Sequence, residues 1–155
     1  MTYHIESRTL TAQDTAVIRS SMPAAELPAW LAGVYEEVYR YLCDRGVPTD
    51  GPPFARVAVH GDTVDVEAGF PVPGLVPGGR RVIASRLPGG PVAVTNHRGR
   101  YEDLALAYQA VNAWLKEREL EPAGPHWEVY YAGPATQPDP GAWSTDLVRP
   151  YRVGR

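Results

Sequence analysis

The sequence predicts an α+β fold made of two βαββ modules, each with one antiparallel sheet and one long helix, around a central ligand cleft. Three observations predict it. Two segments carry apolar residues at helical spacing, the segments around them alternate like strands, and one part of the chain aligns with another without a gap. Residues 1–155 are expected to form a single domain, with pseudo-repeats at about 1–72 and 80–155.

The first helix is predicted between Pro23 and Arg45, with Ser21 and Pro23 placed to start it. Its apolar residues recur three and four positions apart, which places them on one face: Leu27, Trp30, Leu31, Val34, Tyr35, Val38, Tyr41 and Leu42. Cys43 is expected to be a small buried or half-buried filler. As the single cysteine, it cannot form an internal disulfide.

The second helix is predicted from Tyr101 to Arg118 and ends before Pro122 and Gly124. The same spacing recurs along it, in Leu104, Ala107, Tyr108, Val111, Trp114 and Leu115.

An internal repeat relates the two helices. Shifting the sequence by 73 positions lays residues 31–57 over residues 104–130, and eight residues then meet their own kind. About two such identities are expected by chance at ordinary composition. The matched pairs are Leu31 and Leu104, Ala32 and Ala105, Tyr35 and Tyr108, Val38 and Val111, Leu42 and Leu115, Arg45 and Arg118, Gly51 and Gly124, and Pro52 and Pro125. The chain is therefore a duplicated unit.

Each half is expected to contain one strand pair before its helix and one after it. In the first half these pairs are 3–10 with 15–20, and 54–59 with 63–70 around the turn His60-Gly61-Asp62. In the second half they are hairpins of 82–87 with 91–97 around Pro88-Gly89-Gly90, and of 127–132 with 143–149 around the Pro-rich loop 133–141. A Gly/Pro-rich stretch at 71–79 joins the halves.

The charge balance excludes several functions. Fifteen Lys and Arg residues against 18 Asp and Glu residues give a formal net charge of -3, which supplies no basic field for phosphates, so no direct nucleic-acid partner is expected. Glu6 and Arg8 interrupt the apolar core that a secretory signal needs, and no apolar run reaches membrane-spanning length. These features predict a cytoplasmic protein that does not bind membranes.

Glu128 is the main candidate for chemistry. It lies in the aromatic run from Trp127 to Tyr131, where strand periodicity places Glu128 and Tyr130 on one face and Trp127, Val129 and Tyr131 on the other. A carboxylate in such a strand lies either at a solvent edge or in an aromatic cavity. Ala55 is its counterpart in the first half, so the acid is not a structural requirement of both halves.

The aromatic composition favours a ligand pocket. Nine tyrosines and four tryptophans accompany only two phenylalanines, although a dry core is more simply filled by Phe and Leu. Rings of this kind suit flat or cationic ligands, which they hold by stacking and cation–π contact.

Other chemistries lack their signatures. His4, His60, His97 and His126 have no metal-ligand spacing, so no metal is predicted, and strand-end hydrogen bonding is the expected role of His97. Pro88-Gly89-Gly90 matches neither nucleotide-binding fingerprint, and no cofactor is expected. Ser85 and Ser144 lack the context of an acyl-transfer nucleophile.

Five segments, taken in order, resemble the GyrI-like or AraC-type effector-binding family: GPPFARV, VDVEAGFPV, LPGGPVAVTNHRGRYEDL, WEVYYAGP and WSTDLVRP. The resemblance covers essentially the whole chain and implies two βαββ halves around a shared pocket. It also implies a bacterial small-molecule binder. Members of that family include sensor domains of multidrug-responsive regulators, gyrase inhibitors, and hydrolases that open cyclopropane-bearing DNA-alkylating antibiotics. A separate helix-turn-helix domain does not fit in this length, so the chain resembles a stand-alone sensor.

The resemblance also implies site residues. Glu128 matches the acid at the pocket floor in the family motif W-E-x-Y, which also contains Tyr130, and Tyr101 ends the motif H-x-G-x-Y that begins at His97. Trp143 begins the last strand beside the pocket end. Tyr35 and Tyr108 occupy equivalent repeat positions, which favours helix-to-sheet packing, and contact with the pocket edge is kept as the alternative for either residue. Tyr39 and Trp114 lie on helical faces and are expected in the core, with Tyr39 kept as a further ligand contact.

Three functions remain open at this stage. The leading hypothesis is binding or sequestration of lipophilic, often cationic compounds, with Glu128 supplying charge and the aromatic rings supplying contact area. The enzymatic alternative uses Glu128 and Tyr101 or Tyr130 to open a strained ring by proton transfer. A gyrase-inhibitor role needs an interaction surface that the sequence does not locate, and a partner regulator is likewise not identified.

Overall fold

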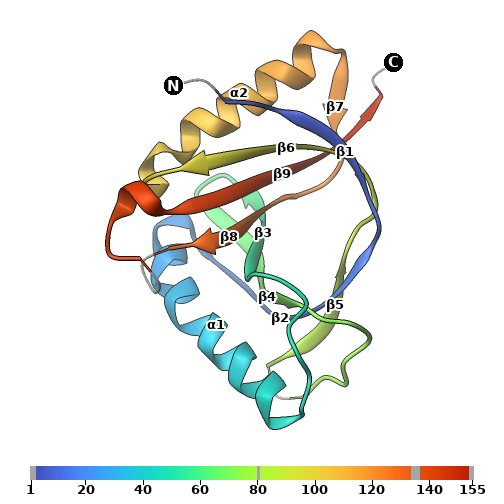
Figure 1. Cartoon of the computed structure of the whole chain (residues 1–155), viewed down its shortest axis with the longest axis vertical. Coiled ribbons are helices and arrows are strands. Elements are labelled where there is room, and N and C mark those ends of the chain that lie inside the picture. Colours follow the sequence, from blue (N-terminus) through green and yellow to red (C-terminus); the bar gives the residue numbers. More distant parts are fainter. Residues whose placement is uncertain (1–2, 80, 134–136, 154–155) are drawn as a thin grey trace. The chain divides into compact units, whose positions relative to one another are not determined.

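Two α-helices and nine β-strands form in the residues that the computed structural model describes, which are 3–79, 81–133 and 137–153 (Figure 1). In chain order they are β1 (Glu6–Leu10), β2 (Gln13–Pro23), α1 (Leu27–Asp44), β3 (Phe54–His60), β4 (Thr63–Pro71), β5 (Ile83–Leu87), β6 (Gly90–Arg98), α2 (Leu104–Glu117), β7 (Leu120–Pro122), β8 (His126–Ala132) and β9 (Ser144–Val153). Short 3₁₀ turns precede α1, α2 and β9, at Ala24–Glu26, Tyr101–Asp103 and Pro140–Ala142. Part of the predicted Pro-rich loop, residues 134–136, lies outside the described residues.

The chain divides into two compact units, residues 11–89 and residues 1–10 with 90–155. We call them the α1 unit and the α2 unit. In the α1 unit the antiparallel strands run in the order β5-β2-β4-β3, and in the α2 unit in the order β1-β6-β9-β8, with β7 added to the end of β9. The two orders are equivalent strand by strand, which confirms the α+β class and the duplicated module.

The helices form where their apolar spacing predicts. In α1 the buried residues are Val34, Val38, Tyr41 and Leu42, and Pro28 occupies the first turn, where no backbone donor is lost. In α2 the buried residues are Leu104, Ala107, Val111 and Leu115. Both helices end where the predicted repeat aligns them, at Asp44 and Glu117.

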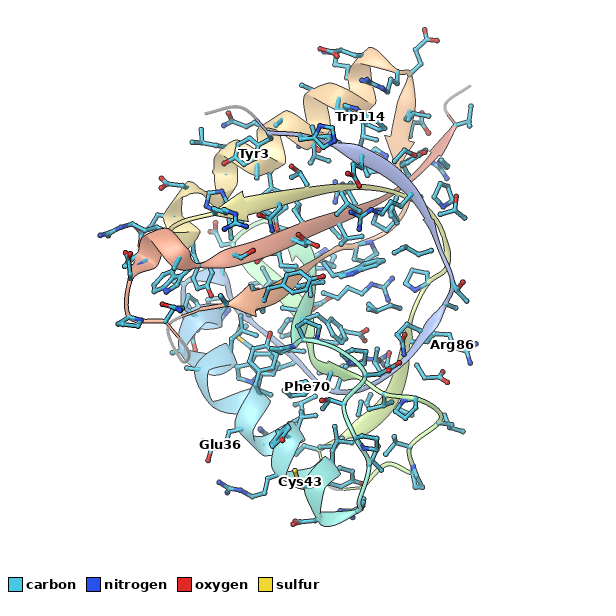
Figure 2. The ribbon with its side chains drawn as sticks, viewed as in Figure 1. Tyr3, Glu36, Cys43, Phe70, Arg86 and Trp114 are labelled. Carbon is cyan, nitrogen blue, oxygen red and sulfur yellow. The ribbon has the colours of Figure 1, made fainter. Side chains whose placement is uncertain are left out.

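Each helix packs on one face of its own sheet. Val111 and Leu115 of α2 join Ala93 of β6 and Leu147 of β9 in one buried cluster. In the α1 unit Phe70 of β4 lies toward α1, where its ring contacts Tyr35 and Tyr39 (Figure 2). Burial of each large apolar side chain in such a layer contributes about 1.5–3 kcal/mol.

One predicted pairing is wrong. Residues 82–87 and 91–97 do not form a hairpin around Pro88-Gly89-Gly90, because β5 pairs with β2 and β6 pairs with β1. The predicted pairing of residues 3–10 with 15–20 is wrong for the same reason, because β1 pairs with β6 and β2 pairs with β5. Pro88-Gly89-Gly90 is suited to a hairpin turn, but it connects β5 to β6 without pairing them. The edge of β2 pairs with β5 instead, and the edge of β6 pairs with β1. The hairpin of β3 and β4 is confirmed, with a positive φ of 63° at Gly61 in its two-residue loop.

Two side-chain placements also differ from expectation. Cys43 is exposed, because the buried stripe of α1 passes through Leu42 and leaves the next residue on the solvent side. Tyr39 is 52% exposed and is not a core residue, although its ring still contacts Phe70. Trp114 packs against the α2 cluster, as predicted.

Candidate functional site

Glu128 lies on the face of the α2-unit sheet that α2 covers. Its cross-strand partner on β9 is Leu147, a member of the cluster under the helix, and side chains of paired residues share a face. The hydroxyl of Tyr108, from α2, donates to Oε2 of Glu128, and the hydroxyl of Tyr130 donates to Oε1 at 2.9 Å. The sequence-predicted grouping of Glu128 with Tyr130 is confirmed by this hydrogen bond.

The two phenols offset the cost of desolvating the carboxylate. Burial, followed by the charge of Glu128, raises the pKa of Tyr108 above its ordinary value. The Tyr108 hydroxyl therefore stays protonated as a donor at neutral pH. The carboxylate is positioned by the protein alone, before any ligand binds.

An aromatic group continues from Glu128 toward solvent. The ring of Tyr101 lies 6.0 Å from that of Tyr130 and 5.1 Å from that of Trp143, measured between centroids. Tyr101 is 36% exposed, and its pKa is raised by burial and then by Glu128. A Cβ at Gly133 would lie 2.6 Å from the Tyr101 hydroxyl oxygen, so the glycine allows this close approach. Four sequence-predicted residues, Glu128, Tyr130, Tyr101 and Trp143, are thus brought together.

The loop that carries Tyr101 is held by a buried histidine. His97 is fully buried, and its Nε2 lies 2.9 Å from the carbonyl oxygen of Arg100. Because that carbonyl can only accept, Nε2 carries the proton, and Nδ1 accepts from the Tyr3 hydroxyl at 2.9 Å. Gly99, with a φ of 119°, donates its N–H to the carbonyl of Trp143 at 3.0 Å. The strand-end role predicted for His97 is confirmed.

This arrangement predicts different results for two substitutions of His97. In His97→Gln the terminal amide occupies the place of Nε2 and keeps a donor to Arg100. In His97→Asn the shorter amide reaches only toward Tyr3. We expect the proton contacts between Tyr101 and Trp143, measured by nuclear Overhauser effects, to persist in the Gln variant and to weaken in the Asn variant.

Both His97 variants lose one buried hydrogen bond and should lose about 1–3 kcal/mol of unfolding free energy. Urea unfolding therefore provides the control for a general loss of stability. Unchanged Tyr101–Trp143 contacts in the Asn variant would show that His97 does not hold the loop.

Two further residues of the site were not singled out from the sequence. His126, on β8, lies with its ring 4.8 Å from that of Tyr108, and its Nδ1 accepts from Arg149 of β9 at 3.3 Å. Burial, and then the charge of Arg149, lowers the pKa of His126 to about 4, so this histidine is neutral at pH 7. The signal for Arg149 was present in the sequence, since it falls two residues after Leu147 and so on the same strand face.

The duplicated module supplies an internal comparison. Ala55 of β3 corresponds to Glu128, and its partner Ala68 corresponds to Leu147. The helix-facing positions that are Ala55, Val57, Val66 and Phe70 in the α1 unit are Glu128, Tyr130, Thr145 and Arg149 in the α2 unit. The fold is satisfied with apolar residues at all four positions, so the polar set in the α2 unit is not a requirement of folding.

Tyr35 and Tyr39 belong to the α1 unit. The Tyr35 hydroxyl donates to the carbonyl of Phe54 at 2.9 Å, and its ring packs edge-on against Phe70. This is the helix-to-sheet packing that the repeat predicted for Tyr35. The repeat equivalent Tyr108 differs because Glu128 is available as an acceptor.

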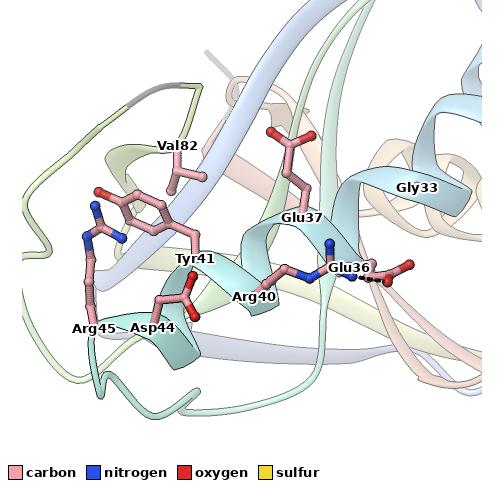
Figure 3. Close-up of a pocket in the computed structure, with 8 residues that line it drawn as sticks. All are labelled: Gly33, Glu36, Glu37, Arg40, Tyr41, Asp44, Arg45 and Val82. Atoms are coloured by element: carbon pink, nitrogen blue, oxygen red, sulfur yellow. Dashed lines mark hydrogen bonds and ion pairs between the residues drawn. The ribbon is translucent and has the colours of Figure 1, made fainter.

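A surface groove of about 450 Å³ on α1 is separate from the predicted residues (Figure 3). It is lined by Gly33, Glu36, Glu37, Arg40, Tyr41, Asp44, Arg45 and Val82. Its charges largely satisfy one another, since Arg40 pairs with Glu36 at 2.5 Å, Arg81 pairs with Glu37 at 2.6 Å, and Arg45 lies over the Tyr41 ring. An open groove of mutually paired surface charges offers a ligand little, so we place the candidate site at Glu128.

Among residues 3–79, 81–133 and 137–153, no group of three or more His, Cys, Asp or Glu side chains is arranged to hold a metal ion. In the same described residues, no helix combines the length and apolar character that crossing a bilayer requires.

The model of the GyrI-like small molecule binding domain family matches residues 58–152, more than half of the chain. The chain belongs to the GyrI-like family. This match confirms the resemblance found in the sequence motifs, and it includes Tyr101, Glu128 and Arg149. Comparison with curated protein sequences gives no significant match.

Solved structures similar to this GyrI-like chain support the fold. The C-terminal domain of EcmrR superposes with a TM-score of 0.87 at 16% identity, covering 99% of each chain. EcmrR in a DNA complex matches with a TM-score of 0.84 and 16% identity over 97% of this chain, which spans only 58% of the EcmrR chain.

Two other structures carry information about their own ligands or activities. A protein described as a hydrolase from Listeria innocua has a TM-score of 0.70 at 13% identity, over 96% of this GyrI-like chain and 91% of its own. SAV2435, bound to tetraphenylphosphonium, has a TM-score of 0.62 at 11% identity, over 98% and 94%. At these identities the likeness shows the fold.

Proposed function

We propose that this GyrI-like chain binds lipophilic, often cationic small molecules at Glu128, as a sensing or sequestering domain. The observation that carries the proposal is the internal comparison of the two modules. A carboxylate, a phenol, a threonine hydroxyl and a guanidinium replace an apolar layer at equivalent positions. Such a replacement costs stability, so we infer that a function retains it.

The geometry favours cations that do not need hydrogen bonds. Both carboxylate oxygens of Glu128 already accept from tyrosine hydroxyls, so the charge of the group remains while its strongest hydrogen-bonding directions are in use. The rings of Tyr101, Tyr130 and Trp143 offer faces for cation–π contact. A bulky cation with delocalised or shielded charge matches this combination, and tetraphenylphosphonium, the ligand of SAV2435, belongs to that class.

Calorimetric titration with tetraphenylphosphonium tests the proposal. We expect a dissociation constant in about the micromolar range, because apolar burial and one charge interaction together favour binding by about 8 kcal/mol. Triphenylphosphine oxide, a neutral molecule of similar shape, is the matched control and should bind at least about tenfold more weakly. Equal binding of the two compounds, or binding of neither, contradicts the proposed cation site.

A hydrolase is the second candidate function. The Listeria innocua protein described as a hydrolase shares the fold, and a carboxylate with positioned phenols is a group that can transfer a proton to a strained ring or hold a water molecule. In that role Glu128 would be the acid or base and Tyr130 or Tyr101 its partner. No feature of the described residues favours the gyrase-inhibitor alternative, so it is not proposed.

A further inference from the structure

Arg149 is a half-buried cation that has no acidic partner among the described residues. Its side chain lies on the α2-covered face of β9, and NH1 donates to Nδ1 of His126 at 3.3 Å. Its Nε is buried and has no hydrogen-bond partner among the described residues. Within those residues no carboxylate lies in ion-pair distance of the guanidinium, although exposed arginines such as Arg152 have one.

The surroundings of Arg149 penalise its charge. Burial lowers its pKa from the ordinary arginine value, and the neighbouring His126 is neutral at pH 7. Placing an unpaired guanidinium in such a setting costs stability. The α1 unit avoids this cost, since Phe70 occupies the equivalent position and packs against Tyr35 and Tyr39.

The position of Arg149 relative to Glu128 suggests what the charge serves. The two residues are diagonal neighbours on adjacent strands, because Glu128 faces Leu147 and Arg149 follows two residues later. The Cα atoms of diagonal pairs of this kind lie about 7–8 Å apart. Tyr108 donates its hydroxyl to Glu128, and its ring packs against His126, which accepts from Arg149. The same face of the sheet therefore carries a negative and a positive group at diagonally neighbouring positions.

We propose that Arg149 is an anion subsite beside Glu128, so that the preferred ligand is a zwitterionic aromatic compound with both a cationic group and a carboxylate. The inference rests on the proposed function, because it assigns the second charge of the same ligand. The guanidinium donates to the ligand carboxylate through its terminal NH2 group, which gives the charge of Arg149 an acidic partner.

A pair of rhodamine dyes tests this subsite, one as the ethyl ester and one as the free acid of the same dye. The ester is a cation and the acid is a zwitterion at pH 7.5. We expect the parent protein to bind the acid at least about fivefold more tightly, which corresponds to about 1 kcal/mol. In Arg149→Met the preference should disappear through weaker binding of the acid, while Arg152→Met, an exposed arginine of the same strand, should keep it.

Replacement of a buried charge by an apolar residue of similar size is neutral or stabilising, so the Arg149→Met variant is expected to fold. A parent protein that binds the ester as well as the acid, or a preference that survives in Arg149→Met, overturns the subsite. Tighter binding of both dyes by the variant would also overturn it, because Arg149 would then act only as a counter-charge to Glu128.

A second measurement separates this inference from the proposed function. Benzoate is titrated into the protein while the ¹⁵N–¹H signal of Arg149 Nε is followed by NMR. A saturable shift that is absent for Arg152 supports the subsite, and no shift overturns it. Should tetraphenylphosphonium and both dyes fail to bind, the proposed function fails, and the benzoate titration alone decides the role of Arg149.

Discussion

Replacing Glu128 by Gln is expected to weaken the binding of tetraphenylphosphonium by about 1–3 kcal/mol, or roughly 5-fold to 150-fold, the scale of an interaction with a charged group. The substitution keeps the shape of the side chain and removes its charge. It therefore separates electrostatics from packing. Triphenylphosphine oxide should lose little affinity, because its binding depends on contact area with Tyr101, Tyr130 and Trp143.

The fold of the Glu128→Gln variant should remain intact. The amide oxygen still accepts from one tyrosine hydroxyl, and the amide avoids part of the desolvation cost of a carboxylate. Thermal unfolding should therefore show a midpoint that is unchanged or slightly raised. Glu128→Ala, which copies Ala55 of the α1 unit, is the matched second variant and should lose the same charge-dependent affinity.

The same variant distinguishes binding from catalysis. If the protein opens cyclopropane-bearing alkylating compounds, Glu128→Gln should abolish turnover while the neutral substrate still binds, because proton transfer is lost and contact area is not. A variant that binds cationic and neutral ligands as the parent does, and keeps any turnover, would show that Glu128 is not part of the site.

Replacing Gly69 by Ala is expected to lower the free energy of unfolding by about 3 kcal/mol or more. A Cβ at this position would lie 1.9 Å from the carbonyl oxygen of Ala16, a backbone atom of the paired strand β2. Neither strand can move freely, because β2 is paired on both edges and Gly69 also pairs with Phe54. Strain in the backbone or a local break in the sheet must follow.

Gly33→Ala is the matched control for Gly69→Ala. Gly33 lies on the exposed side of α1, and a Cβ there meets no atom within 4 Å. Alanine should raise stability by up to about 1 kcal/mol, because glycine in a helix interior costs conformational entropy. Both changes in unfolding free energy can be measured by urea unfolding. In thermal unfolding, each kcal/mol corresponds to a shift of about 2–4 °C in the midpoint. Near-parental stability of Gly69→Ala would contradict the close approach of the two strands.

Parts of the fold were determined by the sequence itself. The helices at 27–44 and 104–117, the hairpin around Gly61, and the common face of Glu128 and Tyr130 all follow from side-chain periodicity and turn chemistry within short segments. The repeat was also visible, since the two modules still share residues at the positions that pack. Treatment of residues 1–155 as one domain stays a prediction.

Only the tertiary structure decided which strand edges meet. The pairing of β1 with β6 and of β5 with β2, the bond from Tyr108 to Glu128, and the bond from Arg149 to His126 each join residues distant in sequence. Local sequence fixes which face of a strand a side chain occupies, because successive residues alternate across the pleat. It does not fix the neighbouring strand or helix that covers that face. That choice depends on which edges and apolar faces remain to be covered when the whole unit packs.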